Sequence, residues 1–444
     1  MLPTVDRRLF LRATGSAFAA LAASGCMRTP LTGALSAGAG GLGGVGYGPL
    51  RPDPAGLIDL PEGFSYRVIS QLGDEMNDGF TVPDRADGMG CFDMGDGKIA
   101  LVRNHELQPQ NDGGGVVGPA YDTVARSLVP LPGGTTTLVL DAATLNLERE
   151  YRSLAGTIRN CAGGITPWGS WLTCEENVDR ANGRVNKDHG YVFEVPAAAP
   201  GLVDPVPLKA MGRFNHEAAC VDPATGIVYL TEDRNDSLLY RFLPNVRGGL
   251  AAGGKLQALV VDGIGDTRNW EGIGFAPQSW QSVRWIDMDD AEAPEDDLRL
   301  RGAAAGASLF ARGEGIWMGE GELYFCCTSG GVAKLGQIFR LRPQGSGLDV
   351  LQLFFESTSI DQLNYGDNLT VAPSGHLILC EDQYTADAAN HLRGITPEGV
   401  AYPIALSRER TEWAGACFSP DGRTLFVNLY SPAKTLAITG PWIA

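Results

Sequence analysis

The sequence predicts an all-β fold, a six-bladed β-propeller with a metal site on its axis. Three observations predict it: a hairpin pattern occurs six times, most of these hairpins end in residues that can bind a metal, and long amphipathic helical patterns are few. The 444-residue chain contains 59 glycines and 27 prolines, which suits many tight turns. A propeller accommodates such a length as one closed unit.

Each hairpin pattern is a glycine turn followed by a run rich in Val, Ile, Leu, Tyr and Phe, as in GIVYLTED at 226–233. The glycines lie in turn sequences such as PATG and SPDG. The six patterns span residues 97–106, 169–177, 226–233, 321–329, 375–382 and 422–431. Each pattern predicts a strand that follows a tight turn.

A second apolar run precedes each of these glycines and begins with a polar residue. The polar residues are Asp87, Asn160, Glu217, Glu314, Asp367 with Asn368, and Glu412. A unit of two or more strands therefore recurs along the chain, and repeats of this kind are typical of radial arrays of small antiparallel sheets. We expect six such sheets around one axis.

Acidic residues stand at the ends of the predicted strands. If equivalent strand ends face one axis, they gather Glu106, Cys174, Glu175, Glu217, Glu232, Asp233, Glu314, Glu381 and Asp382. Carboxylates within about 4–6 Å of one another raise each other's pKa, so bound cations would have to compensate their charge. Calcium takes about six to eight oxygen ligands, whereas a thiolate such as that of Cys174 would favour a softer metal such as iron or zinc.

Two histidines precede glutamates in NHE motifs at 104–106 and 215–217. Neighbouring side chains of a strand point to opposite faces, so we expect Glu106 and Glu217 to face the axis and His105 and His216 to be supporting or structural. Sequence patterns of other catalytic classes are missing: there is no CxxC, HExxH, GxSxG or P-loop motif.

The N-terminal region indicates export. DRRLFLR at 6–12 precedes an apolar stretch too short to span a bilayer, and residues 1–26 resemble a signal for the twin-arginine translocon. AASGC at 22–26 resembles a lipoprotein cleavage box with Cys26 as the acylated residue; the alternative is cleavage nearby and a soluble product. We expect a periplasmic or extracellular location, a Gly/Ala-rich tether at 27–57 and the propeller at 58–444.

The formal net charge of −17 argues against nucleic acid or anionic membranes as partners. Eight cysteines follow Cys26, and five of them stand in apolar runs, where we expect buried thiols rather than disulfides. These five are Cys91, Cys220, Cys326, Cys380 and Cys417.

Several segments, in order and spanning nearly the whole mature chain, resemble those of PhoX-type alkaline phosphatases. They are NCAGGITPWGSWLTCEEN at 160–177, FNHEAACVDPATGIVYLTEDR at 214–234, FARGEGIWMGEGELYFCCTSGG at 310–331, NLTVAPSGHLILCED at 368–382 and FSPDGRTLFVNLYSPAKTLAITGPW at 418–442. NHE at 104–106 and PGGTTTL at 132–138 are similar too.

The resemblance implies a six-bladed enzyme that hydrolyses phosphate monoesters with an oxo-bridged cluster of ferric iron and calcium. We expect a monomer that acts on small phosphorylated metabolites. The resemblance also implies that Cys174 binds iron, that Glu217 and Glu232 bind iron or calcium, and that Glu314 and Asp382 complete the calcium shell. Arg312 and Glu314 would be the catalytic residues, with Arg312 clamping the substrate phosphate.

Other functions remain open. One is a calcium-dependent propeller hydrolase acting on lactones, which would need the acids but neither Cys174 nor Arg312. A phosphodiesterase relative and a non-catalytic, metal-stabilised binding propeller are further alternatives. An acidic insertion at 284–304 is expected between blades, where it would shape the mouth of the channel, so substrate preference does not follow from the resemblance.

Overall fold

The computed structural model describes residues 45–181, 183–344, 348–383 and 389–442. The predicted signal peptide, Cys26 and most of the predicted tether lie outside this part. The described chain confirms the all-β prediction, because its helical elements are the short helix α1 (Leu298–Ala304) and two single turns, η1 (Lys209–Met211) and η2 (Leu250–Ala252). Within these residues, no helix is long and apolar enough to cross a membrane.

The strands form five antiparallel sheets. The first contains β4 (Ala86–Gly95), β5 (Lys98–His105), β6 (Gly133–Asp141) and β7 (Leu147–Thr157). The second contains β8 (Asn160–Ile165), β9 (Ser170–Glu175) and β10 (Val192–Pro196). The third contains β11 (His216–Val221), β12 (Val228–Glu232), β13 (Tyr240–Pro244), β14 (Gly254–Val261), β15 (Trp280–Asp287), β16 (Gly313–Met318), β17 (Leu323–Cys327), β18 (Gln337–Arg342) and β19 (Val350–Glu356).

The last two sheets combine strands from both ends of the described chain. One contains β20 (Gly366–Val371), β21 (Leu377–Glu381), β22 (His391–Ile395), β23 (Ala401–Ser407), β2 (Ile58–Pro61) and β1 (Leu50–Arg51). The other contains β24 (Trp413–Phe418), β25 (Thr424–Leu429), β26 (Lys434–Thr439) and β3 (Ser65–Gln71).

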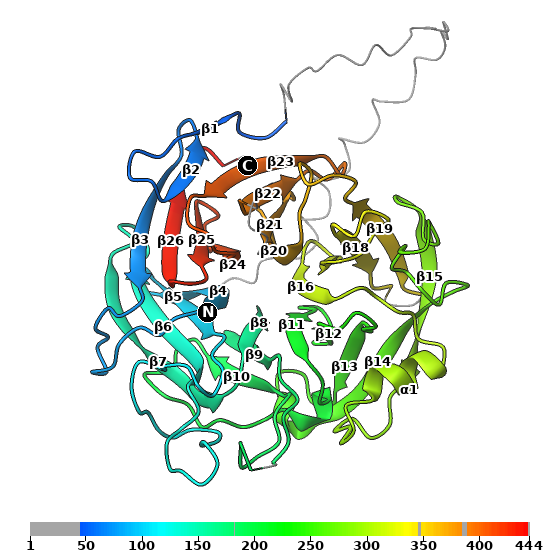
Figure 1. The fold of residues 1–444 in the computed structure, drawn as a ribbon, viewed down its shortest axis with the longest axis horizontal. Helices are drawn as coiled ribbons and strands as arrows, with labels where there is room; N and C mark the ends of the chain where they lie inside the picture. Colours follow the sequence, from blue (N-terminus) through cyan, green and yellow to red (C-terminus); the bar gives the residue numbers. More distant parts are fainter. Residues whose placement is uncertain (1–44, 182, 345–347, 384–388, 443–444) are drawn as a thin grey trace, which may run out of the picture. The chain divides into compact units, whose positions relative to one another are not determined.

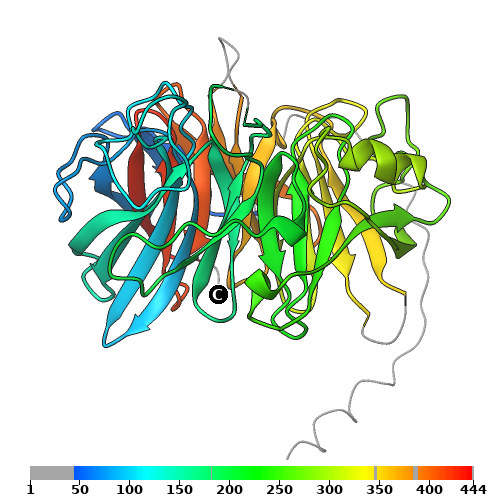
Figure 2. The same cartoon turned by 90° about the horizontal axis from the view of Figure 1, so that it is seen from below.

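Six innermost strands form a ring around one axis, which defines a propeller (Figures 1 and 2). In the order β4, β8, β11, β16, β20, β24, each strand packs against the next, and β24 packs against β4. The sequence predicted six separate sheets, whereas the hydrogen-bonded sheets number five. The reason is β15, which pairs with both β14 and β19 and so joins β11–β14 to β16–β19 in one nine-stranded sheet. This strand includes part of the insertion predicted at 284–304.

The ring is closed by the pairing of β3 with β26, so strands from the beginning and the end of the domain share a sheet. A buried arginine ties this closing sheet to the first one. The guanidinium of Arg103 on β5 lies 2.7 Å from the Glu150 carboxylate and donates to the hydroxyls of Ser70 on β3 and Thr435 on β26. A buried ion pair is tolerated there because these hydroxyls satisfy further hydrogen bonds.

The folded domain begins before residue 58, where the sequence analysis placed its start. The strand β1 pairs with β2, and the ring of Tyr47 packs edge-on against Phe64 and Trp442 at centroid distances of 4.8 and 5.6 Å. The segment from Tyr47 to β1 is therefore part of the domain rather than of a tether, because aromatic contacts hold it to the C-terminal end.

The hydrophobic core lies in the layers between consecutive sheets. One layer, for example, joins Phe92 of β4 and Val102 of β5 to Trp171 and Phe193 of the next sheet. The eight cysteines from Cys91 to Cys417 are free thiols, and all but Cys91 are buried. The prediction of buried thiols is thus confirmed apart from the partial exposure of Cys91.

Candidate metal centre

Every inner strand begins with a β-bulge. The pairing with the second strand of the sheet shifts register within the first five residues of all six inner strands, between residues 86 and 89, 160 and 163, 216 and 219, 313 and 316, 366 and 369, and 414 and 417. Bulges re-aim side chains next to functional sites. Here a β-bulge occurs at the start of all six inner strands around the axis.

The second residue of each inner strand can bind a metal in five of the six cases. We call these five residues the bulge ring: Asp87, Cys161, Glu217, Glu314 and Asp367. In the sixth strand this position is Ala414, and the next residue, Gly415, has a φ of +63°. A side chain at Gly415 would place its Cβ 2.3 Å from the carbonyl oxygen of Asp87, so this strand can offer no ligand there.

The residue after each second strand forms another ring. Its backbone N–H donates to the carbonyl oxygen of the residue before the inner strand of the same sheet, for example from Glu106 to Arg85 at 3.0 Å and from Asp382 to Tyr365 at 2.9 Å. This bond occurs in all six repeats, so the positions are equivalent. We call the donors the post-strand ring: Glu106, Glu176, Asp233, Thr328, Asp382 and Tyr430.

The acceptors of these bonds form a third ring. We call it the pre-strand ring: Arg85, Arg159, Asn215, Arg312, Tyr365 and Glu412. Five of these side chains, all but that of Tyr365, reach the post-strand residue of the preceding repeat. Arg159 bonds Glu106 at 2.6 Å, and Arg312 bonds both oxygens of Asp233 at 2.7 and 2.9 Å. The three rings together place nine carboxyl groups and one thiol around one axis.

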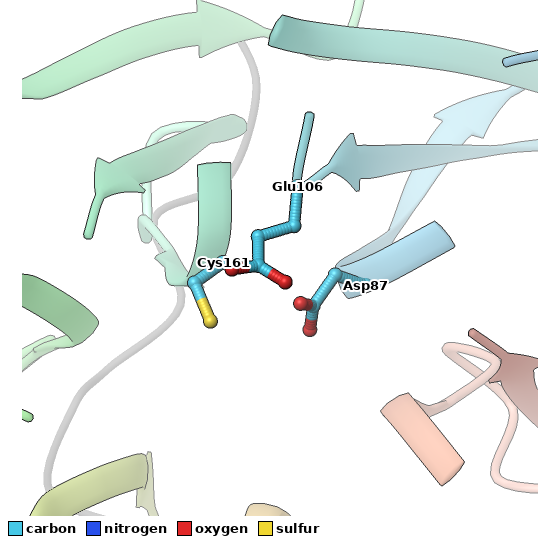
Figure 3. Close-up of side chains that lie close together, drawn as sticks. All are labelled: Asp87, Glu106 and Cys161. Atoms are coloured by element: carbon cyan, nitrogen blue, oxygen red, sulfur yellow. The ribbon is translucent and has the colours of Figure 1, made fainter. Parts of the chain in front are cut away.

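Ligand atoms of these rings lie close enough to share cations. Three groups have ligand atoms within 4.8 Å of one another: Asp87, Glu106 and Cys161; Cys161, Glu176 and Glu217; and Glu217, Glu314 and Asp367. Figure 3 shows the carboxylates of Asp87 and Glu106 and the sulfur of Cys161 converging on one space. Because the groups share Cys161 and Glu217, they form one continuous site with room for several ions.

The site is strongly unfavourable for so many negative charges without cations. Burial raises the pKa of Glu217 well above its ordinary value, and the charges of Asp367 and Glu176 raise it further. Burial and the neighbouring Asp382 raise the pKa of Asp367 to about 7. Burial also raises the pKa of Glu176 to about 8, although Arg159 opposes the shift. Like charges in a buried cluster produce shifts of this direction.

Glu217 provides the strongest test of whether the site fits metal ions. Its side chain is fully buried, and among the described residues neither carboxylate oxygen has a hydrogen-bond partner. Buried polar groups are almost always paired, and an orphaned carboxylate costs several kcal/mol. One oxygen each of Asp87 and Asp382 is likewise buried without a partner. These oxygens fit hard cations, which supply the missing counter-charge.

The structure brings five of the nine predicted metal ligands to the axis: Glu106, Glu217, Asp233, Glu314 and Asp382. The inward orientation expected for Glu106 and Glu217 is confirmed. His105 instead bonds Thr136 and the carbonyl oxygen of Asp84, and His216 bonds the carbonyl oxygen of Gly212. Both histidines are structural.

The other three predicted acids lie off the axis with protein partners. Glu175 bonds His189 at 2.6 Å, and Glu381 bonds Arg393 at 2.8 Å. One oxygen of Glu232 accepts from the Tyr240 hydroxyl; the other is buried without a hydrogen-bond partner among the described residues and lies 3.8 Å from Arg299 of α1, in the insertion. Each is the last residue of its strand, so the following acid, and not this one, faces the axis.

Cys174 belongs to none of the three ligand groups. It is fully buried in a hydrophobic cluster with Leu172, Val192 and Phe214. On β9 it lies between the residues that pair with β8 on either side of the bulge, and it has no paired residue of its own on β8. The thiol on the axis is that of Cys161. Sequence reasoning did not select Cys161, Glu176, Asp87 and Asp367 as candidate ligands, although Asp87 and Asp367 were noted as polar residues that open apolar runs.

Arg312 lies beside the site, where it contacts Glu314 of the bulge ring. Its side chain is 29 % exposed, and its φ of +54° is rare for a residue with a side chain. Its Nε and Nη2 donate to Asp233 and Glu314. Among the described residues, Nη1 has no protein partner and is available to an anion.

We expect the stability of the metal-free protein to fall as pH rises. The carboxyl pKa values of Asp367 and Glu176, at about 7 and 8, lie above their unfolded values near 4, so ionisation disfavours the folded state. The contribution of these two carboxyl groups to the free energy of unfolding is fully present below about pH 4, and it is lost as pH rises through 7 to 8. Thermal unfolding of chelated protein between pH 5 and 8 measures it; an unchanged melting temperature would contradict the site electrostatics.

The fold and the rings define a class of protein, a propeller with an acidic, thiol-containing centre for several cations on its axis. The sequence model of the family Alkaline phosphatase PhoX matches residues 45–146 and 131–433. The chain belongs to this family, and the resemblance seen in the sequence is confirmed. It is therefore related to phosphatases.

One solved structure supports the fold. PhoX from Pseudomonas fluorescens, in complex with vanadate as a transition state analogue, superposes with a TM-score of 0.68 at 20 % identity, covering 86 % of this chain and 96 % of that one. A gluconolactonase from Xanthomonas campestris covers 89 % of this chain and 99 % of its own at 14 % identity, but its TM-score of 0.37 is too low to support an argument. No curated protein matches the chain.

Proposed function

We propose that this protein is an exported, metal-dependent alkaline phosphatase that hydrolyses monoesters of small phosphorylated metabolites. The orphaned, fully buried carboxylate of Glu217 carries the proposal, since it calls for cations at the centre of the three rings. Family membership supports phosphate ester hydrolysis as the use of those cations. Counting the nine-stranded sheet as two blades, in line with its two inner strands, supports a six-bladed propeller.

We propose calcium and ferric iron as the ions. The carboxylates of the rings are the hard oxygen ligands that calcium prefers, while the thiol of Cys161 next to Glu106 and Glu176 suits iron. Cys161 therefore replaces Cys174 as the proposed iron ligand. When bound, such ions supply charge neutralisation and Lewis acidity for phosphoryl transfer.

The chain's own part in the reaction is to bind and orient the phosphoryl group. The free Nη1 of Arg312 donates to a phosphoryl oxygen, and Asp233 and Glu314 hold the guanidinium in one orientation through three hydrogen bonds. Because these partners fix the side chain before substrate arrives, little conformational entropy is lost on binding. Glu314 thus links the arginine to the proposed ions.

The sequence alone supports the remaining proposals. The arginine pair at 7–8 supports export by the twin-arginine translocon to the periplasm or beyond, with Cys26 as a candidate lipid anchor. The net charge of −17 supports small-molecule substrates rather than nucleic acid. We expect a monomer.

The test is to measure the metal content of the folded protein by elemental analysis together with its turnover of p-nitrophenyl phosphate. We expect iron and calcium, activity that rises toward alkaline pH and is lost on chelation, and competitive inhibition by orthovanadate. Calcium re-addition should restore the calcium-dependent part of the activity. Metal-free protein, or metal-loaded protein without phosphatase activity, would overturn the proposal.

A further inference from the structure

Three arginines occupy equivalent positions in the pre-strand ring. Arg85, Arg159 and Arg312 each precede an inner strand and have φ values of +56°, +48° and +54°. Left-handed backbone is uncommon for such residues, and strain of this kind clusters at ligand clamps. Tyr365 of the same ring has a φ of +57°, so the conformation belongs to the pre-strand position, and three of the six positions use it to present an arginine beside the site.

The three arginines differ in what neutralises them. Arg159 bonds Glu106 and Glu176, and Arg312 bonds Asp233 and Glu314. Arg85 has no ion pair among the described residues. Its Nη1 lies 3.3 Å from the hydroxyl oxygen of Tyr430, and its guanidinium lies 5.8 Å from the centre of that ring.

The sequence explains why Arg85 differs. Each of the three arginines reaches the post-strand residue of the preceding repeat, which is an acid for Arg159 and Arg312 but Tyr430 for Arg85. The Tyr430 hydroxyl donates to Glu106 and accepts from Arg85. Arg85 is therefore held in place without losing its positive charge to a carboxylate.

Arg85 and Arg312 stand on opposite sides of the axis. Arg85 precedes β4 and Arg312 precedes β16, three places apart in the ring of six inner strands (Figure 1). An anion over the axis would meet one guanidinium from each side. Two opposed cations favour a dianion over a monoanion, because each added charge is attracted by both.

We propose that Arg85 is a second substrate-binding residue, which holds the phosphoryl group opposite Arg312 and selects dianionic monoesters over monoanionic diesters. This inference rests on the proposed phosphatase function. Tyr430 acts through Arg85 and Glu106 and is a positioning residue.

The test compares Arg85→Gln with wild type, using full-length, metal-loaded protein. We expect KM for p-nitrophenyl phosphate and the inhibition constant of orthovanadate to rise about tenfold to a hundredfold, as for a lost charge-assisted hydrogen bond. KM for bis(p-nitrophenyl) phosphate should rise less, and iron and calcium content should stay unchanged. Arg85→Lys should recover part of the affinity, because it restores charge but not the planar fork.

Arg423→Gln is the matched control, since this arginine lies in the turn between β24 and β25 with 87 % of its side chain exposed. It should leave every constant unchanged. Equal effects of Arg85→Gln on both esters, or unchanged vanadate inhibition, would overturn the inference, and so would loss of metal. If Arg85→Gln does not fold, Arg85→Lys provides the test: its KM for the monoester should rise more than its KM for the diester, and an equal rise in both would overturn the inference. Absence of phosphatase activity in the wild type would instead refute the proposed function.

Discussion

Glu217→Gln is expected to abolish most phosphatase activity while making the metal-free protein more stable. Glu217 belongs to two of the three ligand groups, so a neutral amide there weakens ion binding on both sides. Lewis-acid stabilisation is worth several kcal/mol, and each 1.36 kcal/mol is about a tenfold change in rate, so kcat/KM should fall about a thousandfold. Elemental analysis should show reduced metal content.

The gain in stability follows from the burial of the carboxylate. Burial and neighbouring charges raise the pKa of Glu217, which means that its ionised form disfavours the metal-free fold. At pH 8 the chelated variant should therefore melt at a higher temperature than the chelated wild type. A variant that loses stability in both the metal-free and the metal-loaded state would show that Glu217 is structural.

Glu232→Gln is the matched control for this variant. Glu232 is also a fully buried acid, and it was equally a predicted ligand, but its carboxylate accepts from Tyr240 and lies away from the three ligand groups. Burial raises its pKa to about 8, so an amide is a close substitute for the neutral acid. Activity and metal content should stay within about twofold of wild type.

Cys161→Ser is expected to remove iron, whereas Cys174→Ser should leave it in place. A serine hydroxyl is not ionised and is a poor substitute for a thiolate, so iron content should drop and kcat should fall about a hundredfold or more. Calcium content should change less, because its carboxylate ligands remain. Iron analysis and p-nitrophenyl phosphate turnover of the two variants measure the difference.

The cost of Cys174→Ser should appear in stability instead. Its thiol is fully buried among apolar side chains such as Leu172 and Val192, where a hydroxyl without a partner costs about 1–3 kcal/mol. Thermal unfolding should therefore occur at a lower temperature while turnover is retained. Loss of iron in Cys174→Ser and its retention in Cys161→Ser would restore the original sequence-based assignment.

The sequence was sufficient to predict the hairpins and the axial gathering of acids, because strand composition, glycine turns and repeats are local signals. It also correctly oriented Glu106 and Glu217, since side chains alternate along a strand. Three pairs of consecutive acids follow Cys174, Thr231 and Cys380. The same alternation predicts that only one acid of each pair faces the axis, and by analogy with Glu106 this is the second one.

The ligands of the bulge ring were harder to predict. A bulge adds a residue that breaks the two-residue period, so alternation no longer tells which side chain faces the axis. Cys161 was overlooked for this reason, and the neighbouring Asn160 was taken as the polar residue that opens the run. Likewise, the joining of two sheets by β15 depends on long-range pairing that no local signal specifies.

The closure of the ring by β3 and β26 makes the metal centre a late product of folding. The axial acids extend from Asp87 on the first sheet to Asp382 and Glu412 near the C-terminal end, and each of the three ligand groups draws its members from two sheets. Tight ion binding therefore requires the whole circle, and the free energy of binding is released only when the first and last strands meet. Bound ions would therefore stabilise only a propeller whose ring of sheets is closed. A fragment that lacks either end of the domain should neither bind the metal ions nor be stabilised by them.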